Sequence, residues 1–278
     1  MPEVSEHQGE IAIPAVTGGP IPLFWRSAPV AGAVTPLYLH GVPTSSDDWV
    51  PFLERTGGVA PDLPGFGRSG KPGYLTYTME EYDRFLERFL DDRALDRVSL
   101  VVHDWGAVGL LTAQRMPERI ARIVIINAVP LLPGYRWHRT ARIWRTPVLG
   151  EFSMGMTFRS TLRQLTRESN ATPGPLPEQW IDSTMAHFDQ GTQRAILRLY
   201  RSSPPEKLAA AGARLGELDV PALVVWGVRD PYIPAHFGAD FAAALPRAEL
   251  AEYANAGHWG WLDRPDMIDR VAAFLSDG

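Results

Sequence analysis

Four short apolar runs constrain the fold of this 278-residue chain more than any other feature. They lie at 37–39, 98–102, 123–126 and 222–226, and apolar residues follow one another in them instead of alternating with polar ones. Continuous runs of this length are typical of strands that are buried on both faces of a parallel sheet. The chain is therefore expected to contain a sheet that is covered on both sides.

Amphipathic helical patterns separate these runs. They fall at 78–93, 106–119, 236–245 and 265–275, and in the first of them apolar residues recur at three- and four-residue spacing. Strands that alternate with helices predict an α/β fold with a doubly wound, mostly parallel sheet.

Two segments depart from this alternation. Residues 10–16 and 21–28, separated by glycines and a proline, predict an antiparallel hairpin at one edge of the sheet. Between residues 131 and 207 no strand pattern appears, which predicts a helical insertion. We therefore expect a core domain formed by 1–130 and 208–278, with a helical cap formed by 131–207.

Composition limits the function classes. The chain has no cysteine, which excludes disulfides, a thiolate nucleophile and a cysteine-based zinc site. A net charge of −5 gives no broad attraction to nucleic acid. The start of the chain lacks the pattern of a secretory signal, and no apolar stretch is long enough for a membrane span. We expect a cytoplasmic protein without a cofactor that acts on a small molecule; nothing indicates its oligomeric state.

The junction between the second run and the following helix places a carboxylate at a tight turn. Asp104 follows the strand pattern directly, and Gly106 leaves space for the helix to approach the strand closely. Such a turn can lift a reactive side chain above the sheet. The alternative is that Asp104 only caps the following helix, which is a common role for aspartate.

The segment 101–106, Val-Val-His-Asp-Trp-Gly, resembles the nucleophile elbow of the α/β-hydrolase superfamily, in the branch where aspartate replaces serine. Haloalkane dehalogenases and epoxide hydrolases share this form. Four other segments resemble that superfamily in the same order along the chain: His40–Pro43, Asp62–Ser69, Trp226–Pro231 and Asn255–Trp259. The resemblance implies an α/β-hydrolase fold.

The same resemblance assigns roles to single residues. It implies Asp104 as nucleophile, Asp230 as the acid that orients the histidine, and His258 as the base. Taken singly, Asp230 before Pro231 is also ordinary turn chemistry. Both partners nevertheless follow apolar strands, at the edge where open α/β sheets bind ligands.

An aspartate nucleophile suits displacement at saturated carbon, because attack on a carbonyl would give only an anhydride. The expected product is an ester of Asp104, which splits the hydrolysis into two easier steps. His258 would then activate water against this ester. By resemblance, the backbone N–H groups of Val42 and Trp105 would stabilise the oxyanion.

Epoxide hydrolysis ranks first among the expected reactions. An opened epoxide needs a proton donor, and Tyr200-Arg201 matches the second cap tyrosine of epoxide hydrolases in spacing and neighbour. The first tyrosine is not evident, since Leu149, Phe152 and Met154 occupy its place, and Tyr135 is a distant substitute. Tyr200 is alternatively an aromatic residue of the cap core.

Dehalogenation is the alternative. A halide needs only N–H donors, and Trp105 would supply its indole. Val42 stands where many dehalogenases have an asparagine, which removes one of two halide donors. A cap tryptophan could replace it, and the candidates are Trp137, Trp144 and Trp180.

We expect an apolar substrate pocket to which His40, Phe152 and Trp259 contribute. Two other functions remain open beside hydrolysis. A small-molecule binder could keep this pocket without turnover, although it would not need all three triad residues. A metal-dependent hydrolase is disfavoured, because no histidine or carboxylate cluster has ligand spacing.

Overall fold

The computed structural model describes residues 2–276, and in them one eight-stranded sheet organises the chain. The strands are β1 (Ser5–Ile11), β2 (Ile21–Ala28), β3 (Thr35–Leu39), β4 (Gly58–Pro61), β5 (Val98–Asp104), β6 (Ile120–Ala128), β7 (Ala222–Gly227) and β8 (Ala248–Tyr253). Their spatial order is β1-β2-β4-β3-β5-β6-β7-β8. Pairing is parallel from β4 through β8 and antiparallel for β1 with β2 and β2 with β4.

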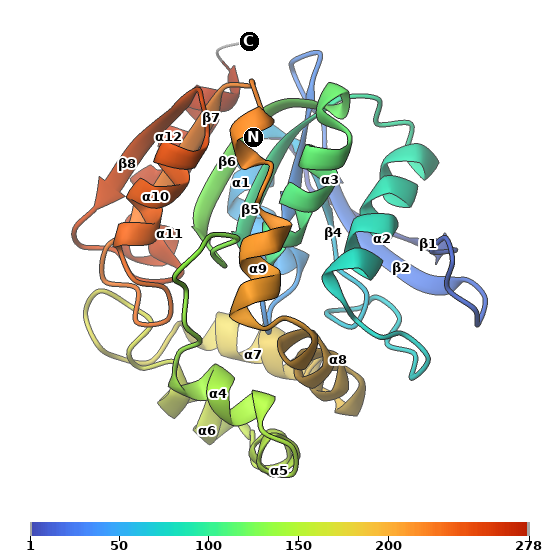
Figure 1. Ribbon diagram of the computed structural model, residues 1–278, viewed down its shortest axis with the longest axis vertical. Helices are drawn as coiled ribbons and strands as arrows, with labels where there is room; N and C mark the ends of the chain where they lie inside the picture. The colour runs from blue at the N-terminus through green and yellow to red at the C-terminus, as the bar shows by residue number, and fades with distance from the viewer. Residues whose placement is uncertain (1, 277–278) are drawn as a thin grey trace.

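Helices cover both faces of the sheet (Figure 1). Those of the core are α1 (Val50–Thr56), α2 (Met79–Asp92), α3 (Gly109–Arg115), α9 (Pro205–Ala211), α10 (His236–Ala244), α11 (Gly260–Asp263) and α12 (Asp266–Ser276). One apolar cluster joins the sheet to α2, α3 and α10, and a second joins the opposite face to α1 and α12. Strands β5 and β6 lie between the two clusters, which explains their continuous apolar runs.

The expected α/β-hydrolase fold with a mostly parallel sheet is confirmed, and so is the helical insertion. Short helices lie between β6 and α9 and gather at one end of the sheet (Figure 1): α4 (Arg139–Arg145), α5 (Leu149–Gly155), α6 (Arg159–Leu165), α7 (Glu178–Ala186) and α8 (Gln190–Ser202). The domain boundaries at residues 131 and 207 remain predictions.

The first strand of the hairpin was predicted at the wrong place. It runs from Ser5 to Ile11 and pairs with β2 across a loop of residues 12–20. Pro14 lies in the predicted segment 10–16 and cannot donate to a strand ladder, which explains why the strand ends before it. The edge strand β8 was missed, because its half-exposed residues carry no continuous apolar run.

The inserted helices are tied to the core by polar contacts. Ser183 of α7 donates to Asp47, which lies in the 3-10 helix η1 (Ser46–Trp49). Arg194 and Arg198 of α8 donate to backbone carbonyls at 71–75. These contacts hold the insertion over the carboxyl end of the parallel strands. Among residues 2–276, none of the helices has both the length and the apolar character that a bilayer crossing needs.

Candidate active site

Asp104 is held on a strained turn at the end of β5. Its φ of 48° and ψ of −121° lie outside the regions that residues other than glycine favour. The chain turns directly into the 3-10 helix η2 (Trp105–Val108), which continues into α3. A Cβ at Gly106 would lie 2.1 Å from the carbonyl oxygen of Leu39, so only glycine allows this approach. Strain of this kind is found at functional sites.

The Asp104 carboxylate lies beside the loop that follows β3. Its Oδ1 accepts a hydrogen bond of 2.8 Å from the backbone N–H of Val42. Burial raises the pKa of Asp104, whereas the nearby His258 and the N–H groups of Val42 and Trp105 act in the opposite direction. A Cβ at Gly41 would lie 2.4 Å from the Asp104 Cβ, which explains the glycine at this position.

His258 joins the two carboxylates. Its Nδ1 lies 2.7 Å from Asp230 Oδ2, and its Nε2 lies 3.7 Å from Asp104 Oδ2. Burial lowers the pKa of His258, but the charge of Asp230 and the hydrogen bond to it raise it, and the net pKa lies above the usual value. The ring is 2% exposed. This arrangement gives a base oriented by an acid and separated from Asp104 by more than a hydrogen bond.

Asp230 follows β7 and is fixed by four donors. Its Oδ1 accepts the backbone N–H groups of Tyr232 (2.7 Å) and Ile233 (3.0 Å). Its Oδ2 accepts Asn127 Nδ2 at 2.9 Å in addition to the imidazole. Asn127 is the penultimate residue of β6 and was missed by the sequence analysis. Its position at the carboxyl end of an apolar strand was the available signal.

A cavity between the cap and the core opens onto the Asp104 side chain. Its empty volume is about 660 Å³ with its opening included. The lining includes residues of the core (Val42, Asp104, Tyr232, His258 and Trp259) and of the cap (His138, Thr140, Trp144, Leu162, Phe188, Ile196 and Tyr200). Aliphatic and aromatic side chains dominate this set. Such a lining accepts an apolar molecule.

Two residues expected in the pocket lie elsewhere. His40 is fully buried beneath the loop, where its Nε2 accepts from Leu63 N–H at 2.9 Å. Phe152 is 66% exposed on the outer side of α5. Neither belongs to the cavity lining. Which face a short cap helix turns inward depends on its packing partners, and periodicity alone does not determine it.

Tyr200 and Trp105 lie against each other at the site. Their rings pack edge to face with centroids 5.2 Å apart, and Tyr200 lines the cavity. Burial raises the pKa of the Tyr200 phenol well above its usual value, so the hydroxyl keeps its proton. The Trp105 indole is near enough to act in the opposite direction on this pKa, but its buried N–H has no hydrogen bond of good geometry within residues 2–276.

The other candidate donors differ in availability. The indole N–H of Trp137 is taken by the carbonyl of Ser203 at 3.0 Å, whereas Trp144 lines the cavity. Trp180 packs on Trp259 and lines a different cavity. Tyr135 is buried but does not line the active-site cavity. In the described part of the chain, no group of three or more histidine, cysteine or carboxylate side chains is arranged to hold a metal.

Known proteins share this architecture. The model of the alpha/beta hydrolase family matches residues 37–272. The chain is 29% identical to a haloalkane dehalogenase of Bradyrhizobium diazoefficiens, over 91% of this chain and 94% of that protein. It is 33% identical to haloalkane dehalogenase 1 of Mycobacterium bovis, over 70% of this chain and 67% of that protein.

A solved structure is similar over almost the full length. A haloalkane dehalogenase from Bradyrhizobium elkani matches with a TM-score of 0.82 and 24% identity, covering 99% of this chain and 98% of that one. At this level of identity the likeness supports the fold, and the sequence relatives carry the assignment to a family.

Proposed function

Because this chain belongs to the α/β-hydrolase family, in its haloalkane dehalogenase-like branch, we propose that it hydrolyses the carbon–halogen bond of a small apolar haloalkane through an ester of Asp104. The observation that carries the proposal is the position of the Asp104 carboxylate. Its Oδ1 is bound to the Val42 N–H, and Oδ2 lies on the side of His258, next to an apolar cavity.

The two oxygens of Asp104 then have different roles. Oδ2 attacks the carbon and expels the halide, since Oδ1 is already engaged by a backbone donor. Water next loses a proton to His258 Nε2 and attacks the Asp104 carbonyl carbon. The negative charge collects on Oδ1, beside the N–H groups of Val42 and Trp105. The bond between the carbonyl carbon and Oδ2 then breaks, Oδ2 leaves in the alcohol with the proton from His258, and the new Asp104 carboxyl group releases the second proton of the water. The products are alcohol, halide and a proton.

The two substrate classes differ in how the leaving group must be stabilised. A halide needs donors without proton transfer, and the unpaired indole N–H of Trp105 supports this function. Trp105 itself is not part of the cavity lining but packs on Tyr200, which lines the cavity with Trp144, and these two residues are further donors. The names of the relatives favour dehalogenation as well. We therefore place dehalogenation ahead of epoxide hydrolysis, which reverses the order expected from the sequence.

Epoxide hydrolysis is the second candidate, and Tyr200 is the observation that favours it. A protonated phenol beside Asp104 could donate to the alkoxide. A second free tyrosine is harder to find: Tyr232 also lines the cavity, but its hydroxyl is engaged by Leu165 and Ser169. Tyr200 would therefore have to act alone as the hydroxyl donor to the alkoxide.

Trapping of the ester tests the proposal. His258→Ala blocks hydrolysis, so 1-bromobutane should add one butyl group without bromine to the intact protein, detected by mass spectrometry. Asp104→Asn should add nothing, and the fold of both variants is checked by circular dichroism. A mass increase equal to whole styrene oxide, with none from 1-bromobutane, would move epoxide hydrolysis to first place. Failure of both reagents to label folded His258→Ala would overturn the covalent mechanism.

A further inference from the structure

A fourth carboxylate lies close to the candidate triad. Asp48 belongs to η1, just after the loop that carries Val42, and is 8% exposed. Its Oδ2 accepts the indole N–H of Trp259 at 3.3 Å. The Trp259 ring packs edge-on against the imidazole of His258, with centroids 4.6 Å apart. One side chain therefore connects Asp48 to the candidate base.

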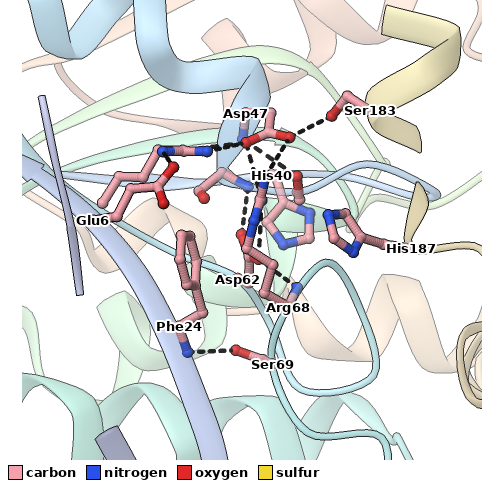
Figure 2. Close-up of polar contacts among 12 residues, drawn as sticks. Glu6, Phe24, His40, Asp47, Asp62, Arg68, Ser69, Ser183 and His187 are labelled. Atoms are coloured by element: carbon pink, nitrogen blue, oxygen red, sulfur yellow. Dashed lines mark hydrogen bonds and ion pairs between the residues drawn. The ribbon is translucent and has the colours of Figure 1, made fainter. Parts of the chain in front are cut away.

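The preceding residue, Asp47, provides a comparison for the Asp48 carboxylate. Asp47 pairs with Arg26 and Arg68 and accepts from Ser183. Figure 2 shows Arg68 and Ser183 beside it. Asp48 forms no salt bridge within residues 2–276. A buried carboxylate without a cation is unfavourable for folding, so its retention calls for a compensating interaction.

The charged groups around Asp48 indicate that His258 supplies this compensating interaction. Burial raises the pKa of Asp48 to about 7; hydrogen bonds from Thr44 and Trp259 lower it, the charge of Asp47 raises it and that of His258 lowers it. Arg26 and Arg68 line the same cavity as Asp48 but are engaged by Asp47. A cation on His258 therefore favours the charged form of Asp48.

The coupling also acts on His258. The groups whose charges act on the imidazole are Asp230, Asp104 and Asp48, each of which raises its pKa. His103 and His138 lie near enough for a charged His258 to lower their pKa values, and they stay neutral because burial lowers these too. Coupling between two titrating groups is reciprocal, so each stabilises the charged form of the other.

Asp48 and Trp259 face different cavities. Asp48 lines a second cavity at the seam between cap and core, with an empty volume of about 1020 Å³ including its opening, whereas Trp259 lines the cavity of Asp104. The second cavity is lined by polar residues such as Ser45 and Gln179 and by apolar ones such as Trp261. The carboxylate therefore reaches the catalytic histidine from outside the substrate cavity.

We propose that Asp48 is a positioning residue for His258: its carboxylate fixes Trp259 against the imidazole and stabilises the imidazolium that forms when His258 takes a proton from water. The inference rests on the proposed function. The proton of the water goes to Nε2, and the hydroxide oxygen bonds to the Asp104 carbonyl carbon. Asp48 forms no covalent bond in the reaction.

The two chemical steps respond differently to this charge. Alkylation of Asp104 moves no proton and forms no imidazolium, so it does not need Asp48. Hydrolysis of the ester forms the imidazolium and does need it. Asp48→Asn keeps the size and the acceptor oxygen for Trp259 and removes only the charge. Asp48→Leu removes both and leaves the indole N–H of Trp259 without its acceptor.

Rapid-quench kinetics with 1-bromobutane separate these steps. In Asp48→Asn, alkylation should stay within about twofold of wild type, and hydrolysis should slow about five- to tenfold through loss of the neighbouring charge. The acid limb of the hydrolysis profile should move to lower pH, since His258 then stays neutral further into acid. Equal slowing of both steps, or an unshifted acid limb, would show that Asp48 is only structural.

An NMR titration tests the effect of the Asp48 charge on the pKa of His258 without enzyme turnover. With ¹⁵N-labelled histidine, and the His258 signals assigned by their absence from His258→Gln, the pKa of His258 should fall in both Asp48→Asn and Asp48→Leu. Trp259→Phe, which removes the indole N–H and part of the ring but keeps the charge of Asp48, should give a smaller fall. Asp266→Asn is the control, because it removes an equal charge at the start of α12, away from both cavities.

The outcomes separate the two proposals. If wild type forms no alkyl-enzyme but the titration shows the shift, the proposed function fails and the role of Asp48 toward His258 stands. If the alkyl-enzyme forms and the pKa of His258 is the same in wild type and both Asp48 variants, the role of Asp48 is overturned and the proposed function is unaffected.

Discussion

The strained backbone of Asp104 depends on the glycine two residues later. The Leu39 carbonyl passes close to Gly106, and a methyl group there would have to displace either the strand end or the helix start. The turn geometry and the position of the carboxylate are therefore set by one close approach between backbones.

We expect Gly106→Ala to lower the free energy of unfolding by about 2–3 kcal/mol and to slow alkylation of Asp104, because the turn must shift to admit the methyl group. Urea denaturation and rapid-quench kinetics measure the two effects. Gly155→Ala is the matched control, since a Cβ at this helical position meets no atom within 4 Å. Wild-type stability and alkylation in Gly106→Ala would contradict this account of the turn.

Asn127 acts on the acid of the site. It donates to Asp230 and Gly227 and accepts the Gly227 N–H at 2.7 Å, all in a fully buried position. It therefore fixes both the carboxylate and the end of β7 that carries it.

Asn127→Leu should reduce stability by about 2–3 kcal/mol, because buried polar groups at Gly227 lose their partners. Ester hydrolysis should slow about tenfold, since the orientation of His258 depends on Asp230. Alkylation should be much less affected. The checks are urea denaturation and single-turnover kinetics, and equal rates for both steps in variant and wild type would refute a role in orientation.

At the scale of elements, the insertion is attached to the core by apolar packing and by polar side chains: α8 belongs to one apolar cluster and Ile181 of α7 to the other. Helix α7 is attached through the contact between Ser183 and Asp47, whereas α8 uses two arginines. Because α7 and α8 pack on different apolar clusters and use separate polar contacts, the two helices should open independently.

Ser183→Ala tests this independence. Loss of the hydrogen bond should reduce stability by about 0.5–1.5 kcal/mol. Hydrogen exchange should become faster in α7 and stay unchanged in α8. The control is Ser160→Ala, at an exposed position of α6. Equal acceleration in both helices would mean that the insertion opens as one unit.

At the scale of the whole molecule, buried histidines make stability depend on pH. Burial lowers the pKa values of His40, His103 and His138, and for His138 the value falls from 6.5 to about 4. The unfolded chain binds a proton near pH 6.5 while folded His138 stays neutral. The stability from this residue is therefore present above 6.5 and lost as the pH falls toward 4.

His138→Asn isolates one of these groups. The imidazole caps α4 by accepting the Ala141 N–H, and asparagine can keep this cap without titrating. Between pH 7 and 4 the variant should lose about 2–3 kcal/mol less stability than wild type. Urea denaturation across this range measures the difference. Parallel pH profiles of the two proteins would contradict the assignment to His138.

Other titrating groups change the stability in the opposite direction. Their contribution cancels when variant and wild type are compared at each pH. The pKa values of Asp48, Asp104 and His258 are raised, so they favour the folded state toward acid in both proteins. The difference therefore reports on residue 138 together with its coupling to His258.

The sequence by itself determined the fold class and pointed to the candidate catalytic residues of the core. Runs such as 98–102 and 123–126 are apolar because both faces of their strands are covered, and this condition is visible in any short segment. The close approach that requires Gly106 is likewise local. Asp104, Asp230 and His258 all stand at strand ends, and the structure brings their side chains together.

Only the tertiary structure decided which further side chains meet at the site. Phe152 fits an apolar pocket by type but lies outside it, whereas His138 and Tyr232 line the cavity. Asn127 and Asp48 gain their importance from partners about 100 and 211 residues away in the chain. Contacts of this range follow from the packing of the cap on the core and of strand ends on one another. No local pattern in the sequence records them.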